Sequence, residues 1–128
     1  MAPRACVVPL VLAAALLAPA PASAAFRPFQ SPTGKLVCAF YSDAETPRQV
    51  RCDWEGGNDN AVVVGETGRG RHITVTDTVR EPNARTLGYG RTTSFGALRC
   101  TSRRSGITCR STRSGHGFTV SVEKQRVF

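Results

Sequence analysis

The side chains of this sequence that are available for acid–base chemistry are the two histidines and the carboxylates of Glu66, Glu81 and Glu123. Cleavage of a phosphodiester needs a general base and a general acid on either side of the phosphate, with arginine to stabilise the developing charge. His72 alternates with apolar neighbours in segment 72–76, which predicts that it lies on the outer face of a strand. His116 stands between Gly115 and Gly117, which predicts a tight turn with a positive φ angle at one or both glycines. Because no spacing brings either histidine to a carboxylate, the sequence favours a non-enzymatic protein over a small enzyme.

The motifs of common catalytic and cofactor-binding sites are absent from the sequence. It contains no Gly-x-Ser-x-Gly motif, no dinucleotide-binding glycine loop and no Gly-Lys-Ser/Thr phosphate loop. It also has no His-Glu-x-x-His motif and no acidic cluster with metal-ligand spacing. We therefore expect neither a cofactor nor a metal ion.

Residues 1–24 have the layout of a secretory signal peptide. A short basic start precedes a nearly continuous apolar run at 7–18, and Ala22-Ser23-Ala24 forms an A-x-A cleavage site. The apolar run is shorter than the roughly 20 residues that span a membrane. We expect cleavage to remove Cys6 and to leave one exported domain, residues 25–128.

The exported domain would retain four cysteines, Cys38, Cys52, Cys100 and Cys109. An even number in a small exported domain predicts two disulfides, and the absence of a C-x-x-C pair argues against a zinc site. Three pairings are possible. The segment around Cys100 and Cys109 is symmetric about the 104–105 bond, so folding it there places these two cysteines opposite each other. We therefore predict Cys38–Cys52 and Cys100–Cys109.

Short alternating segments separated by turn residues dominate the sequence after residue 25. Strands are expected at 36–40, 49–54, 61–65, 72–76, 95–101, 107–110, 117–122 and 126–128. Few positions after residue 25 favour a helix. The sequence therefore predicts an all-β fold, a small antiparallel sandwich or barrel stapled by disulfides.

A cluster of arginines near the C-terminus is the candidate binding surface. Seven basic residues and one acidic residue lie between positions 99 and 126. Such a surface attracts polyanions, which outside a cell include anionic wall polymers, anionic lipid and nucleic acid. Specific nucleic-acid binding is disfavoured because the cluster contains no aromatic residue in sequence. The alternative is that these arginines only keep the domain soluble. The candidate residues are Arg99, Arg103, Arg104, Arg110 and Arg113.

A second function class is an inhibitor of a secreted hydrolase such as a protease. The predicted loop at 102–106 is pinned by the predicted Cys100–Cys109 bridge, and a rigid loop loses little entropy on binding. Its Arg103 and Arg104 would suit a trypsin-like specificity pocket. The alternative is an ordinary hairpin turn.

The sequence resembles an uncharacterised family of small secreted proteins from high-GC Gram-positive bacteria. The family begins with a Phe-x-Ser-Pro-Ser-Gly segment, which corresponds to residues 29–34 with Thr33 in place of the second serine. Further matches are Val-Arg-Cys-Asp at 50–53, Asp-Thr-Val at 77–79 and Leu-x-Tyr-Gly at 87–90. The strongest match is the tail, with Arg-Cys-Thr-Ser at 99–102, Gly-Ile-Thr-Cys at 106–109, Gly-His-Gly-Phe at 115–118, Ser121 and Phe128. Two features depart from the pattern: a further cysteine pair, one member near Thr74, is missing, and so is a tyrosine before the final Phe128. The resemblance implies a secreted, disulfide-bonded domain and no particular activity.

Overall fold

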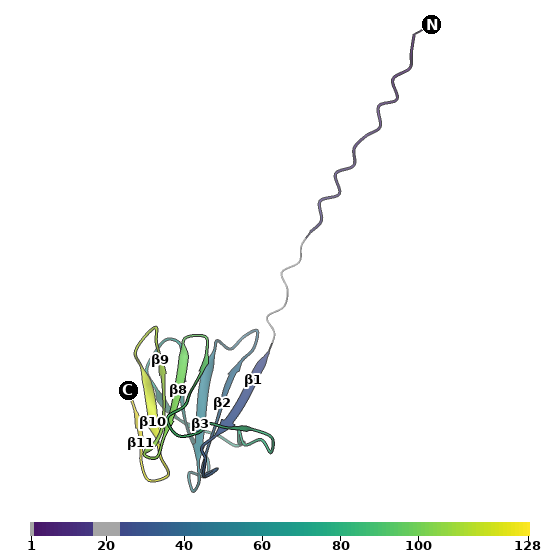
Figure 1. Cartoon of the computed structure of the whole chain (residues 1–128). Coiled ribbons are helices and arrows are strands. Elements are labelled where there is room, and N and C mark those ends of the chain that lie inside the picture. The colour runs from purple at the N-terminus through teal and green to yellow at the C-terminus, as the bar shows by residue number, and fades with distance from the viewer. Residues whose placement is uncertain (1, 17–23) are drawn as a thin grey trace.

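The computed structural model describes residues 2–16 and 24–128. Residues 2–16 contain no regular secondary structure, and every one of them is exposed. They extend away from the body of the protein (Figure 1). The end of the apolar run and most of the expected cleavage motif, Ala22-Ser23-Ala24, lie outside the described residues.

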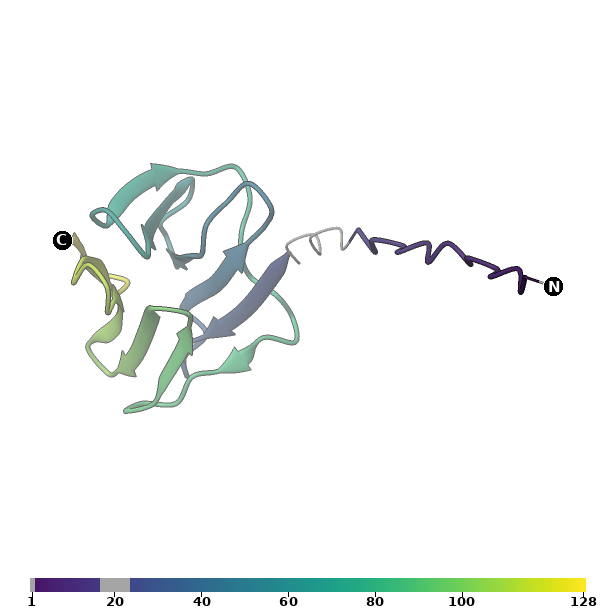
Figure 2. The same ribbon diagram turned by 90° about the horizontal axis from the view of Figure 1, so that it is seen from above.

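Residues 25–128 form eleven strands in two sheets that face each other across a common interior (Figures 1 and 2). The six-stranded sheet contains, in spatial order, β5 (Arg71–Thr74), β4 (Asn60–Gly65), β3 (Gln49–Trp54), β2 (Leu36–Ser42), β1 (Ala25–Gln30) and β6 (Arg85–Thr86). The five-stranded sheet contains β11 (Gln125–Val127), β10 (Gly117–Val120), β9 (Gly106–Ser111), β8 (Leu98–Arg103) and β7 (Thr92–Phe95). The prediction of an all-β fold is confirmed, and its architecture is a sandwich.

Neighbouring strands are antiparallel except at one edge, where β6 pairs with β1 in parallel. This edge was not expected from the sequence, because β1 itself was missed. Pro28, in the middle of β1, cannot donate a backbone hydrogen bond, which argues against a central strand. The structure accommodates it because β6 pairs only with Phe29 and Gln30, so β1 is an open edge at Pro28.

The predicted single strand at 95–101 is wrong. A tight turn at Gly96 and Ala97 divides it into β7 and β8, which pair as a hairpin. Gly96 adopts a φ angle of 58°, a conformation that favours glycine. The carboxylate of Glu66, on the facing sheet's β4–β5 loop, accepts a hydrogen bond from Ala97 N–H at 2.8 Å. A hydrogen bond to a residue 31 positions earlier in the sequence therefore stabilises this turn, which the local sequence does not predict.

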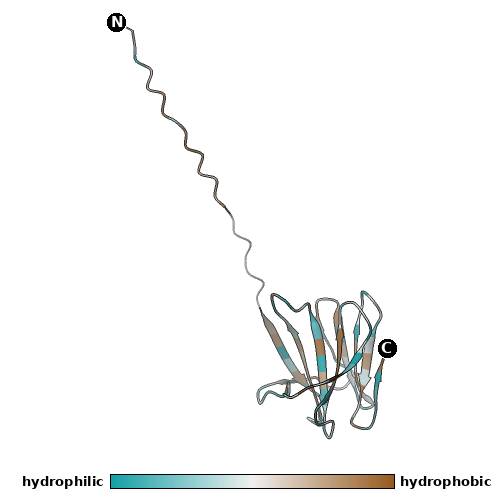
Figure 3. Cartoon of the chain, turned by 180° about the vertical axis from the view of Figure 1, so that it is seen from behind, coloured by the Kyte–Doolittle hydropathy of each residue, from teal (hydrophilic) through white to brown (hydrophobic). Residues whose placement is uncertain are grey.

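Hydrophobic and hydrophilic residues alternate along many of the strands (Figure 3), and the apolar members point into the space between the sheets. Phe40 packs against two other aromatic rings of this core, and its ring centroid lies 5.3 Å from that of Phe29 and 5.7 Å from that of Phe95. Phe118 is fully buried, as the alternation of its strand predicts. Burial of these aromatic side chains, together with the aliphatic residues of the same cluster, stabilises the sandwich.

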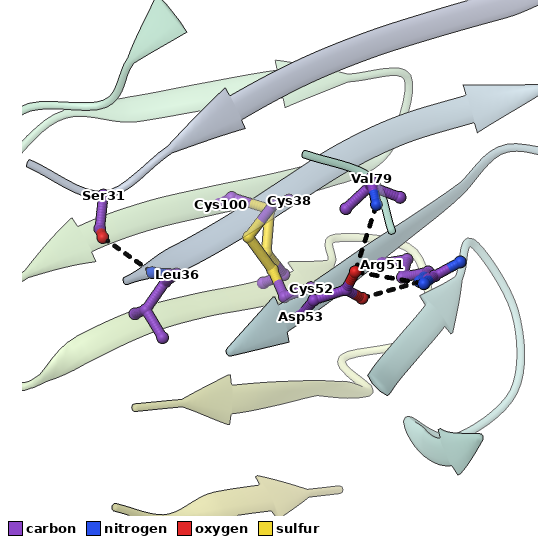
Figure 4. Close-up of a disulfide and its surroundings, with 9 residues drawn as sticks. Ser31, Leu36, Cys38, Arg51, Cys52, Asp53, Val79 and Cys100 are labelled. Carbon is purple, nitrogen blue, oxygen red and sulfur yellow. Dashed lines mark hydrogen bonds and ion pairs between the residues drawn. A yellow bond between two sulfur atoms is a disulfide. The ribbon is translucent and has the colours of Figure 1, made fainter. Parts of the chain in front are cut away.

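Both disulfides lie inside the core. Cys38 is bonded to Cys52 across the β2–β3 hairpin, and Cys100 to Cys109 across the β8–β9 hairpin. These are the two pairs that the sequence predicts, and all four cysteines are fully buried. The Cys38–Cys52 bridge lies beside Cys100 of the facing sheet (Figure 4). Each bridge joins two strands of one sheet, so neither bridge links the two sheets to each other.

A buried arginine fastens the connection between β5 and β6 to the outer face of the six-stranded sheet. The Arg51 guanidinium donates to both carboxylate oxygens of Asp53, to the carboxylate of Asp77 and to the Asp77 carbonyl. Asp53 in turn accepts a hydrogen bond from Val79 N–H at 3.2 Å (Figure 4). Val79 is thereby held over Val37 and Ala39, forming a second, small apolar cluster.

Candidate anion-binding surface

The outer face of the five-stranded sheet is lined by arginine and hydroxyl side chains. In β8 the inward residues are buried, whereas Arg99, Thr101 and Arg103 point outward. In β9 the outward residues are Thr108 and Arg110. The pattern follows from the two-residue period of a strand, because the cysteines on the intervening positions fill the core.

The strand register places the central arginines and threonines in two rows that cross the strands. Arg99 lies directly opposite Arg110, and Thr101 lies directly opposite Thr108. The threonine row continues on both sides, to Thr92 on β7 and Thr119 on β10. The hydroxyls hydrogen-bond in pairs, Thr92 with Thr101 at 2.9 Å and Thr108 with Thr119 at 3.0 Å. The hairpin symmetry in the sequence predicts the pairing of Thr101 with Thr108, but it did not indicate that threonines form part of a candidate binding surface.

A shallow groove of about 340 Å³ runs over the centre of this face. It is lined by Arg99, Thr101, Thr108, Arg110 and Thr112. Like charges placed directly opposite each other destabilise a sheet. In the described part of the chain, neither of the two arginines in the groove forms an ion pair with a carboxylate. An anion bound between them would relieve this repulsion.

The net charge of the domain is confined to one of its two sheets. Residues 25–90, which contain the six-stranded sheet, carry eight basic and eight acidic residues and have no net charge. Residues 91–128, which contain the five-stranded sheet, carry eight basic residues and one acidic residue, Glu123, a net charge of +7. The sandwich therefore has one neutral and one strongly positive layer.

The structure separates the five arginines of the predicted cluster into three groups. Arg99 and Arg110 form the central pair. Arg103 and Arg104 lie at the β8–β9 turn, about 13 Å further along the strand at 3.3 Å per residue. Arg113 follows β9 in the loop at the opposite end of the sheet. The five arginines are close together in sequence, but only Arg99 and Arg110 line the groove.

The pair at the turn has an aromatic neighbour that the sequence did not indicate. The Arg104 guanidinium lies over the ring of Tyr89, 4.9 Å from its centroid. The cluster contains no aromatic residue in sequence, but in the folded protein it has one as a neighbour. The turn itself consists of Arg104 and Ser105 only, because Arg103 already pairs with Gly106. The predicted loop at 102–106 is a closed two-residue turn.

Arg113 lies near the network that joins the two sheets at the other end of the sandwich. The pKa of Glu66 is lowered, first by the hydrogen bond from Ala97 N–H and then by hydrogen bonding and charge from Arg48 and by the charge of Arg113. Ser111 Oγ also donates to the Glu66 carbonyl at 2.7 Å. Arg113 is thus separated from the groove, and its charge acts on Glu66.

The two histidines occupy separate, simple environments. His72 is exposed on the edge strand β5, as predicted. His116 is half-buried in the β9–β10 loop, and neither imidazole forms a hydrogen bond or ion pair with another described side chain. Within residues 2–16 and 24–128, no three His, Cys, Asp or Glu side chains come together in a way that could hold a metal ion.

Of the two glycines that flank His116, one has the predicted positive φ angle. Gly115 has a positive φ angle of 78°, whereas Gly117 does not. Gly117 is required for a different reason: a Cβ there would clash with the carbonyl oxygen of Cys109 on the neighbouring strand.

The fold and surface define a small, all-β, disulfide-bonded sandwich with one strongly basic layer. The chain belongs to a family of unknown function, DUF6636, whose model matches residues 43–128. The Phe-x-Ser-Pro-x-Gly segment at 29–34 precedes the matched region. Searches of curated proteins and of solved structures found no match to the chain. In the described segments of the chain, no helix has the length and apolar character needed to cross a membrane.

Proposed function

We propose that this protein is a secreted, non-enzymatic binding domain whose basic layer binds an extracellular polymer with repeated anionic groups, such as an anionic cell-wall component. The observation that carries the proposal is the opposed pair Arg99 and Arg110 in a hydroxyl-lined groove. Guanidinium groups bind phosphate and carboxylate through paired hydrogen bonds, and threonine hydroxyls can donate to the same ligands.

Charge segregation supports a polymer as the ligand. The single groove would hold one anionic group, but the surrounding layer carries a net charge of +7. A chain lying across the strands would pass along the threonine row toward Arg126, which pairs with Thr119 on the edge of the sheet. Exposed charges of this kind act within about 8 Å at physiological salt, so binding should depend strongly on ionic strength.

Secretion is the second part of the proposal. The apolar run at 7–18 and the A-x-A motif ending at Ala24 support export, and two disulfides are typical of an oxidising compartment. N-terminal sequencing of protein recovered from culture medium tests it. A mature chain that begins at or next to Ala25 supports export with cleavage, whereas a chain that retains Met1 contradicts it.

The test of the binding site compares two double variants with the same change in charge. Arg99→Gln/Arg110→Gln alters the groove, and Arg69→Gln/Arg71→Gln alters exposed arginines on and beside β5 of the neutral layer. Binding is measured to poly(glycerol phosphate), to polygalacturonate and to uncharged dextran. The first two probes separate phosphate from carboxylate recognition, and the third controls for non-specific adsorption.

We expect the groove variant to bind the preferred anionic polymer at least about tenfold more weakly, because two charge-assisted hydrogen bonds are lost. The control variant should bind nearly as well as the wild type. An equal loss in both variants would mean that only total charge matters. Binding that persists at high salt, or that extends to dextran, would also overturn the proposed site.

A further inference from the structure

A second pocket lies at the end of the sandwich where β1 ends. Three connections surround it: the loop between β1 and β2, the turn between β8 and β9, and the turn between β10 and β11. Tyr89, from the connection between β6 and β7, completes its wall. The cavity measures about 210 Å³. Sites for drug-sized ligands measure roughly 300–1,000 Å³, so this pocket fits a single small ring.

Three cationic side chains line the pocket. Lys35 comes from the β1–β2 loop, and Arg103 and Arg104 come from the β8–β9 turn. All three are exposed, and none forms an ion pair in the described part of the chain. The stack of Arg104 on Tyr89 restricts the guanidinium to one region, which lowers the entropic cost of using it to bind a ligand.

Hydroxyl groups and one carboxylate share the pocket with these cations. Ser31 Oγ accepts a hydrogen bond from Leu36 N–H at 3.1 Å, which fixes the position of this buried hydroxyl. Ser121 Oγ accepts from Lys124 N–H at 3.0 Å in the β10–β11 turn. Glu123, the only acidic residue after position 90, also lines the pocket. A carboxylate in this position accepts hydrogen bonds from hydroxyls and disfavours a bare anion.

We propose that this pocket binds one sugar unit that carries a single negatively charged substituent. The charged substituent would lie against Lys35, Arg103 and Arg104. The sugar hydroxyls would hydrogen-bond to Glu123 and the fixed serines, and Tyr89 would contact the ring edge. This site is distinct from the groove between Arg99 and Arg110, and it does not depend on the polymer-binding proposal.

The experiment is an NMR titration of the purified protein with four probes. Glucuronate carries a carboxylate, glucose 6-phosphate carries a phosphate, glucose carries no charge, and inorganic phosphate has no sugar ring. We expect at least one of the two charged sugars to bind with a Kd of about 1 mM or tighter. Its chemical-shift changes should include the amides of Lys35, Tyr89 and Arg104. Glucose and inorganic phosphate should bind at least tenfold more weakly.

Variants identify the groups responsible. Tyr89→Leu removes the aromatic support of Arg104 and should weaken binding several-fold, whereas Tyr89→Phe keeps the ring and should bind like the wild type. Arg104→Gln should weaken binding about tenfold. Arg99→Gln removes a charge from the separate groove and should have no effect here, which distinguishes this site from the proposed polymer site.

Three results would overturn the proposal. The first is that neither charged sugar binds saturably. The second is that inorganic phosphate binds as well as either of them, since the pocket would then be a simple anion site. The third is that Arg99→Gln weakens binding as much as Arg104→Gln, since overall charge would then account for the effect.

Discussion

Replacement of Arg51 by methionine tests whether the buried guanidinium holds the β5–β6 connection on the sheet. Methionine is unbranched and of comparable reach, so it fills the space with little change in packing. It removes all four hydrogen bonds, of which two go to Asp53 and two to Asp77. The side chain of Arg51 is only 9% exposed, so water cannot replace these bonds without local opening.

The expected loss is dominated by Asp53. Its side chain is 14% exposed, and without Arg51 its charge retains only weak donors, Thr78 Oγ1 at 3.3 Å and Val79 N–H at 3.2 Å. Removing one partner of a buried ion pair costs about 3–5 kcal/mol. The Asp77 carboxylate is 75% exposed and adds less than about 1 kcal/mol. We expect the free energy of unfolding of Arg51→Met to fall by about 3 kcal/mol in total, which lowers the Tm of a domain of this size by more than roughly 10 °C.

Chemical unfolding at neutral pH measures this change. Arg71→Met is the matched control, because Arg71 is an exposed arginine on β5 that forms no ion pair with a described residue; it should cost less than about 0.5 kcal/mol. Adding Asp53→Asn to Arg51→Met should recover part of the loss, since it removes the unpaired charge. Hydrogen exchange at Val79 should accelerate. A loss below about 1 kcal/mol for Arg51→Met would refute the reasoning.

Three further predictions concern the other end of the sandwich, its glycines and its disulfides. The folded pKa of Glu66 lies below its ordinary value of 4.5, so its stabilising effect is present above that pH and is lost on acidification; the urea midpoint of the wild type should therefore fall more between neutral and acid pH than that of Glu66→Gln. Gly117→Ala should cost about 1–3 kcal/mol in thermal unfolding through its clash with the next strand, whereas His116→Ala should cost less than about 0.5 kcal/mol, and equal losses would contradict this account. The free energy of unfolding of Cys100→Ala/Cys109→Ala should be about 3 kcal/mol lower than that of the wild type, because the unfolded chain is no longer constrained by a closed loop. An unchanged free energy of unfolding would contradict this prediction.

Local sequence was sufficient to predict the β8–β9 hairpin and its bridge. Apolar and polar residues alternate in this segment, and it is symmetric about a polar turn. Folding it at that turn places Cys100 opposite Cys109 and Thr101 opposite Thr108, as in the structure. All of these relations involve residues within ten positions of each other. The inward position of Phe118 followed from the same two-residue period.

Long-range contacts account for what could not be predicted. The turn at Gly96 depends on Glu66, and strand β1 depends on its register with β2 despite Pro28. In the candidate site, the neighbours of Arg104 in sequence contain no aromatic residue, and Tyr89 reaches it only after the sheet forms. The sequence therefore predicted a single arginine surface where the structure has separate groups, and it did not indicate the pocket beside Tyr89.

The complete burial of both disulfides constrains the order of events during maturation. Once the sheets have closed over Cys38, Cys52, Cys100 and Cys109, neither an oxidant nor a reducing thiol can reach a sulfur atom without opening the domain. Oxidation must therefore occur while the hairpins are still accessible. Each bridge closes within a single hairpin, so each can form on a partly folded chain without the other sheet. After closure, the redox state of the surroundings no longer acts on the native protein, and the bridges persist for as long as the fold does.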